Sequence, residues 1–244
     1  MTDAALVEVS KLTFCYHTRA ALTDVSFRLQ PGITMLLGPN GAGKSTLFAL
    51  LTQMYRLQQG HILFAGRPLN ELGYRANARL GVVFQQQTLD MDLSIRQNLC
   101  YFGALHGLNH RQSLEQAAPL LATFALTERL DDKVRTLNTG HRRRLEIVRA
   151  LMHRPAILLL DEPSVGLDPG SRRELIATVR QYCAAHQVCV LWATHLLDEP
   201  QTGDQLLLLH QGRLLAQGQC AELLSRYGAD TVAQLFSQLM ERAQ

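Results

Sequence analysis

A glycine-rich run of nine residues, Gly-Pro-Asn-Gly-Ala-Gly-Lys-Ser-Thr at positions 38–46, constrains the fold of this chain more than any other feature. It satisfies the spacing G-x-x-x-x-G-K-[ST] in full, from Gly38 to Ser45. Residues 33–37 before it are typical of a buried strand, and residues 46–51 after it are typical of a helix. A glycine turn before an ordinary helix is the alternative, but every demanding position and both flanks favour a phosphate-binding loop.

The residue types in this run explain how it binds phosphate. Gly38, Gly41 and Gly43 permit backbone angles that a Cβ atom forbids, so that N–H groups converge on an anion at a helix N-terminus. Lys44 brings a positive charge to the β- and γ-phosphates, and the Ser45 hydroxyl is a ligand of the kind that Mg²⁺ prefers. Thr46 can reach the α-phosphate. The predicted nucleotide-binding residues of the loop are Gly38, Pro39, Asn40, Gly41, Ala42, Gly43, Lys44, Ser45 and Thr46.

Composition limits the classes of protein to which the chain can belong. Its 244 residues are 47% hydrophobic and 18% charged, which is enough for a sizeable core. A net charge of +3 is too weak to argue for nucleic acid as a partner. No apolar run is long enough to span a bilayer, and the first residues lack a signal-peptide pattern, so we expect a soluble, cytosolic protein. The five cysteines contain no Cys-x-x-Cys pair and are expected to be reduced thiols.

Hydrophobic periodicity predicts an α/β chain with a helical insertion. Residues 6–30 alternate as antiparallel strands do, and further strands are predicted at 60–66, 80–84, 156–162, 188–195 and 206–209. Residues 94–130 have helical periodicity, with a break near 107–110, and 220–243 predict one or two amphipathic helices. His106 and His110 have a spacing that could bind a metal, but Gly107 between them favours a turn between helices.

Polar residues next to these elements are candidates for the site around the phosphate-binding loop. The apolar run 156–160 ends in Asp161 and Glu162, and ligands bind at the carboxyl ends of such buried parallel strands. Tyr16, at a strand end, either stacks on adenine or is an ordinary surface or core tyrosine. Asn138 or Thr139 can cap the helix that follows. We expect Arg142 and Arg143 to form a solvated helix face, and leave the role of Arg144 open.

In this order, the segments resemble the ATP-binding subunit of ABC transporters, over about residues 6–225. The matching parts are Tyr16 for the A-loop, 38–46 for Walker A, Gln85 for the Q-loop, 137–141 for the LSGGQ signature, 157–162 for Walker B, 165–168 for the D-loop and His195 for the switch histidine. The resemblance implies a P-loop NTPase (RecA-like) core with an N-terminal antiparallel β subdomain and an inserted α-helical subdomain. It implies one ABC domain, with a nucleotide-binding core of residues 1–84 and 154–219, a helical subdomain of 85–153 and a C-terminal helical tail of 220–244.

The same resemblance implies ATP hydrolysis with Mg²⁺ as cofactor. Mg²⁺ would be held by Ser45, Gln85 and Asp161, with Glu162 as general base and His195 and Lys44 at the γ-phosphate. Two subunits, either two copies or one copy and a related ATPase, would sandwich two ATP molecules through Asn138, Gly140 and Asp168. A separate membrane permease would dock near Gln86–Leu99, with this subunit peripheral on the cytoplasmic face of the inner or plasma membrane.

The pattern around residues 164–169 resembles the drug-export and ABC-2 branch of that family. Residues 80–99 and 190–199 resemble, more narrowly, ATPase subunits associated with pyrroloquinoline-quinone-dependent alcohol oxidation systems. The signature departs from the family pattern, with Asn138 for Ser, Thr139 for the middle Gly and His141 for Gln. We expect turnover to survive but to be slow, and His141 to add charge below neutral pH.

Three other functions stay open at this point. A P-loop kinase would share the phosphate loop but has no use for Gln85, the signature or His195. A non-transport ABC ATPase of DNA repair or translation usually carries tandem cassettes or long coiled coils, for which this chain has no room. A regulatory subunit that binds ATP and hydrolyses little would fit the altered signature, but not the intact Glu162 and His195.

Overall fold

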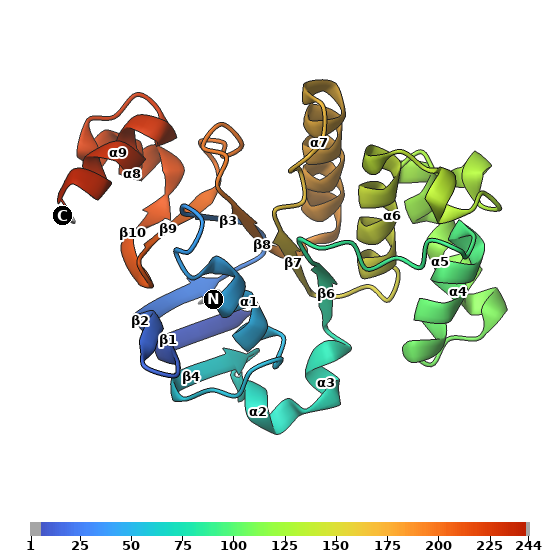
Figure 1. Cartoon of the computed structure of the whole chain (residues 1–244), viewed down its shortest axis with the longest axis horizontal. Helices are drawn as coiled ribbons and strands as arrows, with labels where there is room; N and C mark the ends of the chain where they lie inside the picture. The colour runs from blue at the N-terminus through green and yellow to red at the C-terminus, as the bar shows by residue number, and fades with distance from the viewer. Residues whose placement is uncertain (1–5, 243–244) are drawn as a thin grey trace. The chain divides into compact units, whose positions relative to one another are not determined.

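The computed structural model describes residues 6–242, and the chain forms two compact units. The first unit combines residues 6–77 with 189–242, and the second is Ala78–Val188. Most helices and strands of both units are labelled in Figure 1. The finer division into core, helical subdomain and C-terminal tail stays a prediction.

An antiparallel sheet forms the N-terminal part of the first unit. Its strands are β1 (Val7–Tyr16), β2 (Arg19–Leu29), β4 (Gln59–Phe64) and β5 (Arg67–Pro68), in the order β2-β1-β4-β5. Val9 pairs with Phe27 on one side and with Ile62 on the other, and all three side chains are buried. The alternation of apolar and polar residues therefore predicted β1 and β2 correctly, because one face of these strands is more deeply buried than the other.

Parallel strands in the first unit bring two predicted site segments to one edge. The strand β3 (Gly32–Leu37) lies between β8 (Cys189–Thr194) and β9 (Gln205–His210), parallel to both, and β10 (Arg213–Gln219) runs antiparallel to β9. Leu37 is in register with Thr194, so the residues that follow, Gly38 and His195, leave the sheet side by side. All six residues of β8 are buried, as the continuous apolar pattern predicts.

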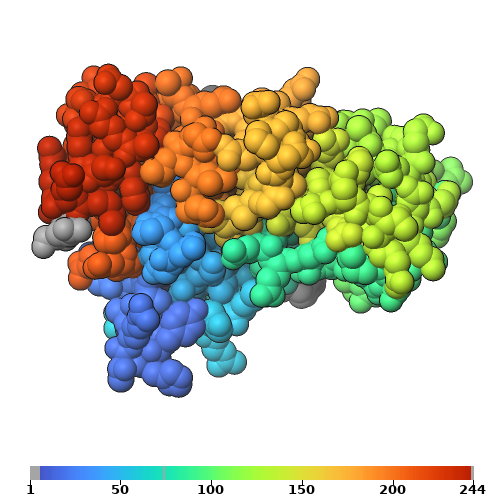
Figure 2. All heavy atoms as spheres, turned by 45° about the horizontal axis from the view of Figure 1, so that its top comes forward, coloured from blue at the N-terminus to red at the C-terminus, as the bar shows by residue number. Residues whose placement is uncertain are grey.

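Helices of the first unit flank these sheets. The helix α1 (Lys44–Leu51) follows the glycine-rich loop, and the C-terminal residues form α8 (Cys220–Tyr227) and α9 (Val232–Arg242), which confirms the predicted amphipathic segments. Figure 2 shows this C-terminal part in red. The short helices α2 (Leu69–Leu72) and α3 (Tyr74–Asn77) were not predicted, since four residues are too few to show a helical period.

The second unit combines a pair of parallel strands with helices. The strands β6 (Leu80–Val83) and β7 (Ile157–Asp161) pair with Val83 opposite Leu160. The predicted helical block contains α4 (Ile95–Leu105) and α5 (His110–Thr123), each begun by a capping box, with Gln97 and Gln112 as the reciprocal side chains. His106 ends α4 and His110 begins α5, so the turn predicted between them is confirmed.

Besides the short 3₁₀ helices η1 (Thr127–Arg129) and η2 (Val134–Thr136), the second unit has two longer helices that carry predicted site residues at their N-termini. The helix α6 (Thr139–Leu151) is capped by Asn138, as expected. The 18-residue helix α7 (Pro169–His186) was not predicted, although Asp168 as N-cap and Pro169 at the first helical position are start signals. Within residues 6–242, no helix is both long and apolar enough to cross a bilayer.

Candidate functional site

The glycine-rich loop of the first unit packs closely against β2 and β9. This close packing requires glycine at two positions of the loop. Gly43 has φ +110°, and a Cβ atom there would lie 2.7 Å from the carbonyl oxygen of Ala21. A Cβ atom on Gly38 would clash with the carbonyl oxygen of Leu209. Any side chain at either position would therefore push the loop away from the sheet edge.

The N-terminus of α1 offers what an anion needs. Among the described residues, no side chain caps this helix, and its first turn contains no acid. Lys44 is 6% exposed, and its Nζ donates to the carbonyl oxygens of Gly38 at 2.6 Å and Pro39 at 3.4 Å. Backbone N–H groups, the helix dipole and a lysine ammonium are thus concentrated on one loop, an arrangement that fits a polyphosphate.

His195 follows β8 at the same edge of the sheet as this loop. The segment that carries it is anchored twice. Thr194 Oγ1 accepts a hydrogen bond from the backbone N–H of Leu196 at 3.0 Å, and the buried Trp192 Nε1 donates to the buried carboxylate of Glu199 at 3.2 Å. The His195 side chain itself is exposed at this edge.

Tyr16, whose role the sequence leaves open, lies next to the phosphate loop. Its hydroxyl is 3.3 Å from Thr46 Oγ1, and its ring contacts Phe14 edge-on with centroids 5.1 Å apart. The tyrosine is nevertheless 41% exposed. A flat ring that is partly exposed beside a phosphate loop can stack on a nucleotide base.

In the second unit, the carboxyl ends of β6 and β7 hold the predicted acids and glutamine. Asp161 and Glu162 are 5% and 4% exposed, and Gln85 follows the neighbouring strand and is exposed. Glu162 has φ +51°, a conformation that is rare for a residue with a side chain and costs free energy. Strain at a buried carboxylate is a feature of functional sites, and oxygen atoms of this kind suit Mg²⁺.

The expectation for Arg143 was wrong: it is not part of a solvated helix face. Its side chain is 12% exposed, and its guanidinium donates to the carbonyl oxygens of Phe84 at 2.9 Å and Gln85 at 3.2 Å. It also pairs with Glu146 at 2.8 Å. The arginine therefore fixes the backbone of Gln85 to α6.

Glu146 and Arg149 extend the same contact, and neither was singled out from the sequence. Glu146 is 2% exposed and accepts a hydrogen bond from the backbone N–H of Thr88 at 2.9 Å. Arg149 donates to the carbonyl oxygen of Thr88 at 2.8 Å and to its hydroxyl. Residues 143, 146 and 149 lie three apart on one face of α6, and this spacing is the signal that could have identified them.

The N-termini of α6 and α7 lie next to each other and carry the signature and D-loop residues. Asn138 Oδ1 accepts a hydrogen bond from the backbone N–H of His141 at 2.8 Å, which leaves the amide nitrogen to donate elsewhere. The Asp168 carboxylate caps α7 through Gly170 and Ser171, both at 3.0 Å. One turn further along α6, Arg144 pairs with Glu174 on α7 at 2.7 Å. The sequence had left the role of Arg144 open.

His141 was expected to add charge below neutral pH, and its surroundings move that change to lower pH. Partial burial lowers the pKa of its imidazole, and the neighbouring Arg129 and Arg144 lower that pKa further. A lowered pKa means that the ring stays neutral until the pH falls further below the ordinary value for histidine.

Removal of the Glu146 carboxylate is expected to destabilise the protein. Because Glu146→Ala leaves the Thr88 N–H without its acceptor and the largely buried Arg143 without its carboxylate partner, the free energy of unfolding should fall by about 3 kcal/mol. The control is Glu174→Ala, which removes a carboxylate that is 60% exposed and should cost less than about 1 kcal/mol. Urea unfolding measures both values, and equal losses would contradict the role given to Glu146.

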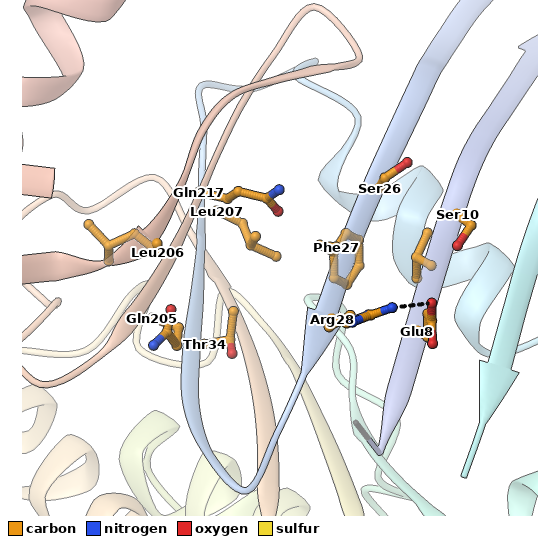
Figure 3. A pocket seen from close by; sticks show the side chains of 12 residues that line it. Glu8, Ser10, Ser26, Phe27, Arg28, Thr34, Gln205, Leu206, Leu207 and Gln217 are labelled. Atoms are coloured by element: carbon orange, nitrogen blue, oxygen red, sulfur yellow. Dashed lines mark hydrogen bonds and ion pairs between the residues drawn. The ribbon is translucent and has the colours of Figure 1, made fainter. Parts of the chain in front are cut away.

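A separate hollow lies on the sheets of the first unit, away from the predicted residues. Its volume is about 450 Å³, and it is lined by residues of β1, β2, β3, β9 and β10, as Figure 3 shows. The dashed line in Figure 3 marks the ion pair between Arg28 and Glu8 at 3.0 Å, in which Arg28 is 70% exposed. None of the predicted nucleotide-binding or catalytic residues lines this hollow.

The fold and the phosphate loop define a P-loop ATPase, and comparison with known proteins gives its family. A family model described as "ABC transporter" matches residues 22–165, which is more than half of the chain. The chain therefore belongs to the ABC transporter family and is an ATP-binding domain of that family, whose members are the ATPases that power transport. This result excludes the P-loop kinase as an alternative.

Among similar proteins, the linearmycin resistance ATP-binding protein LnrL of Bacillus subtilis (strain 168) is 34% identical over 232 residues. That match covers 94% of this chain and 74% of LnrL. The daunorubicin resistance ATP-binding protein DrrA3 of Streptomyces coeruleorubidus is 35% identical, covering 89% of this chain and 69% of DrrA3. A solved ATP-binding subunit of an ABC transporter is 26% identical, with a TM-score of 0.84 and coverage of 96% of this chain and 99% of that one.

Proposed function

We propose that this chain binds and hydrolyses ATP between two ATPase subunits and thereby drives export through a separate membrane permease. The observation that supports it most strongly is the carboxyl edge of the paired strands β6 and β7, where Gln85 follows β6 and the buried Asp161 and Glu162 lie at the end of β7. Among similar proteins, LnrL and DrrA3 are named for resistance to linearmycin and daunorubicin, and others are named for Nod factor export. Export is therefore the direction that we assign to this chain.

In the proposed reaction, water attacks the γ-phosphorus and the bond from that phosphorus to the β–γ bridging oxygen breaks, which releases ADP. Glu162 accepts the proton of the attacking water, and Lys44 neutralises charge on the transferred group. His195 contacts the γ-phosphate. The oxygen atoms of Ser45, Gln85 and Asp161 fit Mg²⁺, which would neutralise further charge on the β- and γ-phosphates.

The second subunit enters the proposal through the N-terminus of α6. Gly140 lies in its first turn, and a methyl group there would meet Ser171 at an ordinary contact distance of 3.7 Å. Packing within the described residues therefore does not demand glycine at this position, whereas close approach of a phosphate to the helix N-terminus does. We assign Asn138, Gly140 and Asp168 to the nucleotide bound by the partner copy or by a related ATPase.

The permease would dock on the second unit, near Gln86–Leu99. In the same unit, α4 exposes Tyr101 and Leu105, at 65% and 66%, and these lie one helical turn apart. Exposed apolar side chains so close together favour a protein contact. A permease contact would place the chain on the cytoplasmic face of the membrane, and the narrower resemblance to alcohol oxidation systems stays a prediction.

Complementation between two inactive variants tests whether the site is shared. Lys44→Ala disables the phosphate loop of its own copy, and Asn138→Ala disables the signature of its own copy. If the signature acts on the other copy, a mixed dimer contains one site with both parts intact, because that site uses Asn138 of the first variant and Lys44 of the second. ATP turnover of the mixture should then exceed that of either variant alone.

Phosphate release from the two variants, singly and mixed at equal total protein, measures this effect. Random pairing makes half of the dimers mixed, each with one of its two sites intact, so we expect up to about one quarter of the wild-type rate. A mixture that is no more active than the sum of its parts would contradict a shared site. Unchanged turnover of Asn138→Ala alone would contradict the role of Asn138.

A further inference from the structure

We infer that Tyr55 and Gln58, in the loop between α1 and β4, hold Tyr16 in the position in which its aromatic ring stacks on the nucleotide base. This inference rests on the proposed nucleotide site and adds two positioning residues to it. Neither residue belongs to the sequence segments that predict the site. Both residues and the end of β1 belong to the first unit, so their contacts lie within that unit.

Gln58 fixes the backbone immediately before Tyr16. Its side-chain oxygen accepts a hydrogen bond from the N–H of Cys15 at 2.7 Å, and its side-chain nitrogen donates to the carbonyl oxygen of Cys15 at 3.0 Å. The pairing of β1 with β4 ends at Thr13 and Gln59, so the side-chain amide of Gln58 takes over where the backbone ladder stops. The strand end that carries Tyr16 is thereby held from both sides, since Cys15 also pairs with Ala20 of β2.

Tyr55 fixes the ring of Tyr16. The two rings are perpendicular, at 84°, with centroids 5.7 Å apart, and Tyr55 also stacks on the buried Phe14 at 5.4 Å. The neighbouring Tyr16 hydroxyl raises the pKa of Tyr55, chiefly through hydrogen bonding. Edge-to-face arrangements of this kind are favoured by the charge distribution of aromatic rings.

Tyr16 is therefore held at three points and still open to a ligand. Gln58 holds its backbone, Tyr55 and Phe14 hold its ring, and Thr46 contacts its hydroxyl at 3.3 Å. Tyr16 and Tyr55 are 41% and 43% exposed, so both side chains keep part of their surface open to solvent. A ring that is already in place loses less conformational freedom when a base stacks on it, and this strengthens binding.

In the proposed site, the phosphates are bound by the glycine-rich loop and Lys44 and not by the tyrosine cluster. The inference can therefore be tested by comparing ligands with and without a base. Loss of Tyr55 or Gln58 should weaken binding of a nucleotide but not of a polyphosphate without a base. A general structural defect would weaken both. The effect should also depend on Tyr16, because these residues act through it.

The test compares dissociation constants for ADP and for inorganic tripolyphosphate, measured on the full chain by calorimetry. Tyr55→Ala and Gln58→Ala are each expected to raise the value for ADP about threefold to tenfold, the size of an aromatic pair energy. The value for tripolyphosphate should be unchanged. Tyr55→Phe, which keeps the ring, should stay within about twofold of wild type. Met54→Ala, at a 64% exposed position of the same loop, is the control and should change neither value.

A double-mutant cycle with Tyr16→Ala completes the test. Tyr55→Ala should have no further effect on ADP binding once Tyr16 is gone, because the coupling is then lost. A full additional effect in that background, or equal losses for ADP and tripolyphosphate, would overturn the inference. Failure of the wild-type chain to bind either compound would instead contradict the nucleotide site itself.

Discussion

The Glu162→Gln variant is expected to hydrolyse ATP at least about 100-fold more slowly than the wild-type chain, while it binds ATP with unchanged affinity. The carboxylate is the group that we assign to accept the proton of the attacking water. Glutamine has nearly the same shape but cannot take up that proton, so the loss should appear in kcat and not in the dissociation constant.

The structure makes Glu162 a well-placed candidate for this role. It follows β7 directly, is 4% exposed and has a backbone φ of +51°, so its position is set by the surrounding fold at a cost in free energy. The control is Glu174→Gln on α7, which changes a glutamate whose side chain is 60% exposed. Turnover of Glu162→Gln within about threefold of wild type would contradict its role as general base.

The Lys44→Ala variant is expected to lose both turnover and affinity. The ammonium lies on the phosphate loop, 2.6 Å from the carbonyl oxygen of Gly38, where it can neutralise the β- and γ-phosphates. Removal of one such donor should lower kcat/KM for ATP by about 100-fold to 1,000-fold. Unlike Glu162→Gln, this variant should also bind ATP more weakly, because ground-state and transition-state contacts are lost together.

Phosphate release and ATP binding are measured for Lys44→Ala against Lys133→Ala, which removes the same charge from an exposed position. The fluorescence of Trp192, the sole tryptophan, reports whether the buried core near His195 is intact. A correctly folded Lys44→Ala protein with wild-type kcat/KM would show that the loop is not the phosphate site.

Local patterns predicted much of this fold and of the site. The alternation in β1 and β2, the apolar runs of β7 and β8 and the spacing of the glycine-rich loop each depend on residues close in sequence. The register of β3 with β8, which brings Gly38 and His195 to one edge, follows from the rule that parallel strands end together.

The contacts that were not predicted join residues far apart in the chain. Arg143 bonds to Phe84, 59 residues earlier, and Gln58 bonds to Cys15, 43 residues earlier. A polar side chain on a helix is usually solvated, and only the tertiary structure shows that Arg143 and Glu146 are buried against the segment after Gln85. Tyr55 was overlooked for the same reason, since it lies in a loop and its partner Tyr16 lies at the distant end of β1.

The most direct test of a shared ATP site is the molar mass of Glu162→Gln in solution. Light scattering is recorded with ATP and with ADP, with Mg²⁺ withheld to keep residual hydrolysis low. The same measurement is made on Glu162→Gln with Asn138, Thr139 and His141 also changed to Ser, Gly and Gln. We predict twice the 27.3 kDa mass of one chain with ATP, and the mass of one chain with ADP. The mass of one chain with ATP, in both proteins, would contradict the proposal that two copies close around the nucleotide.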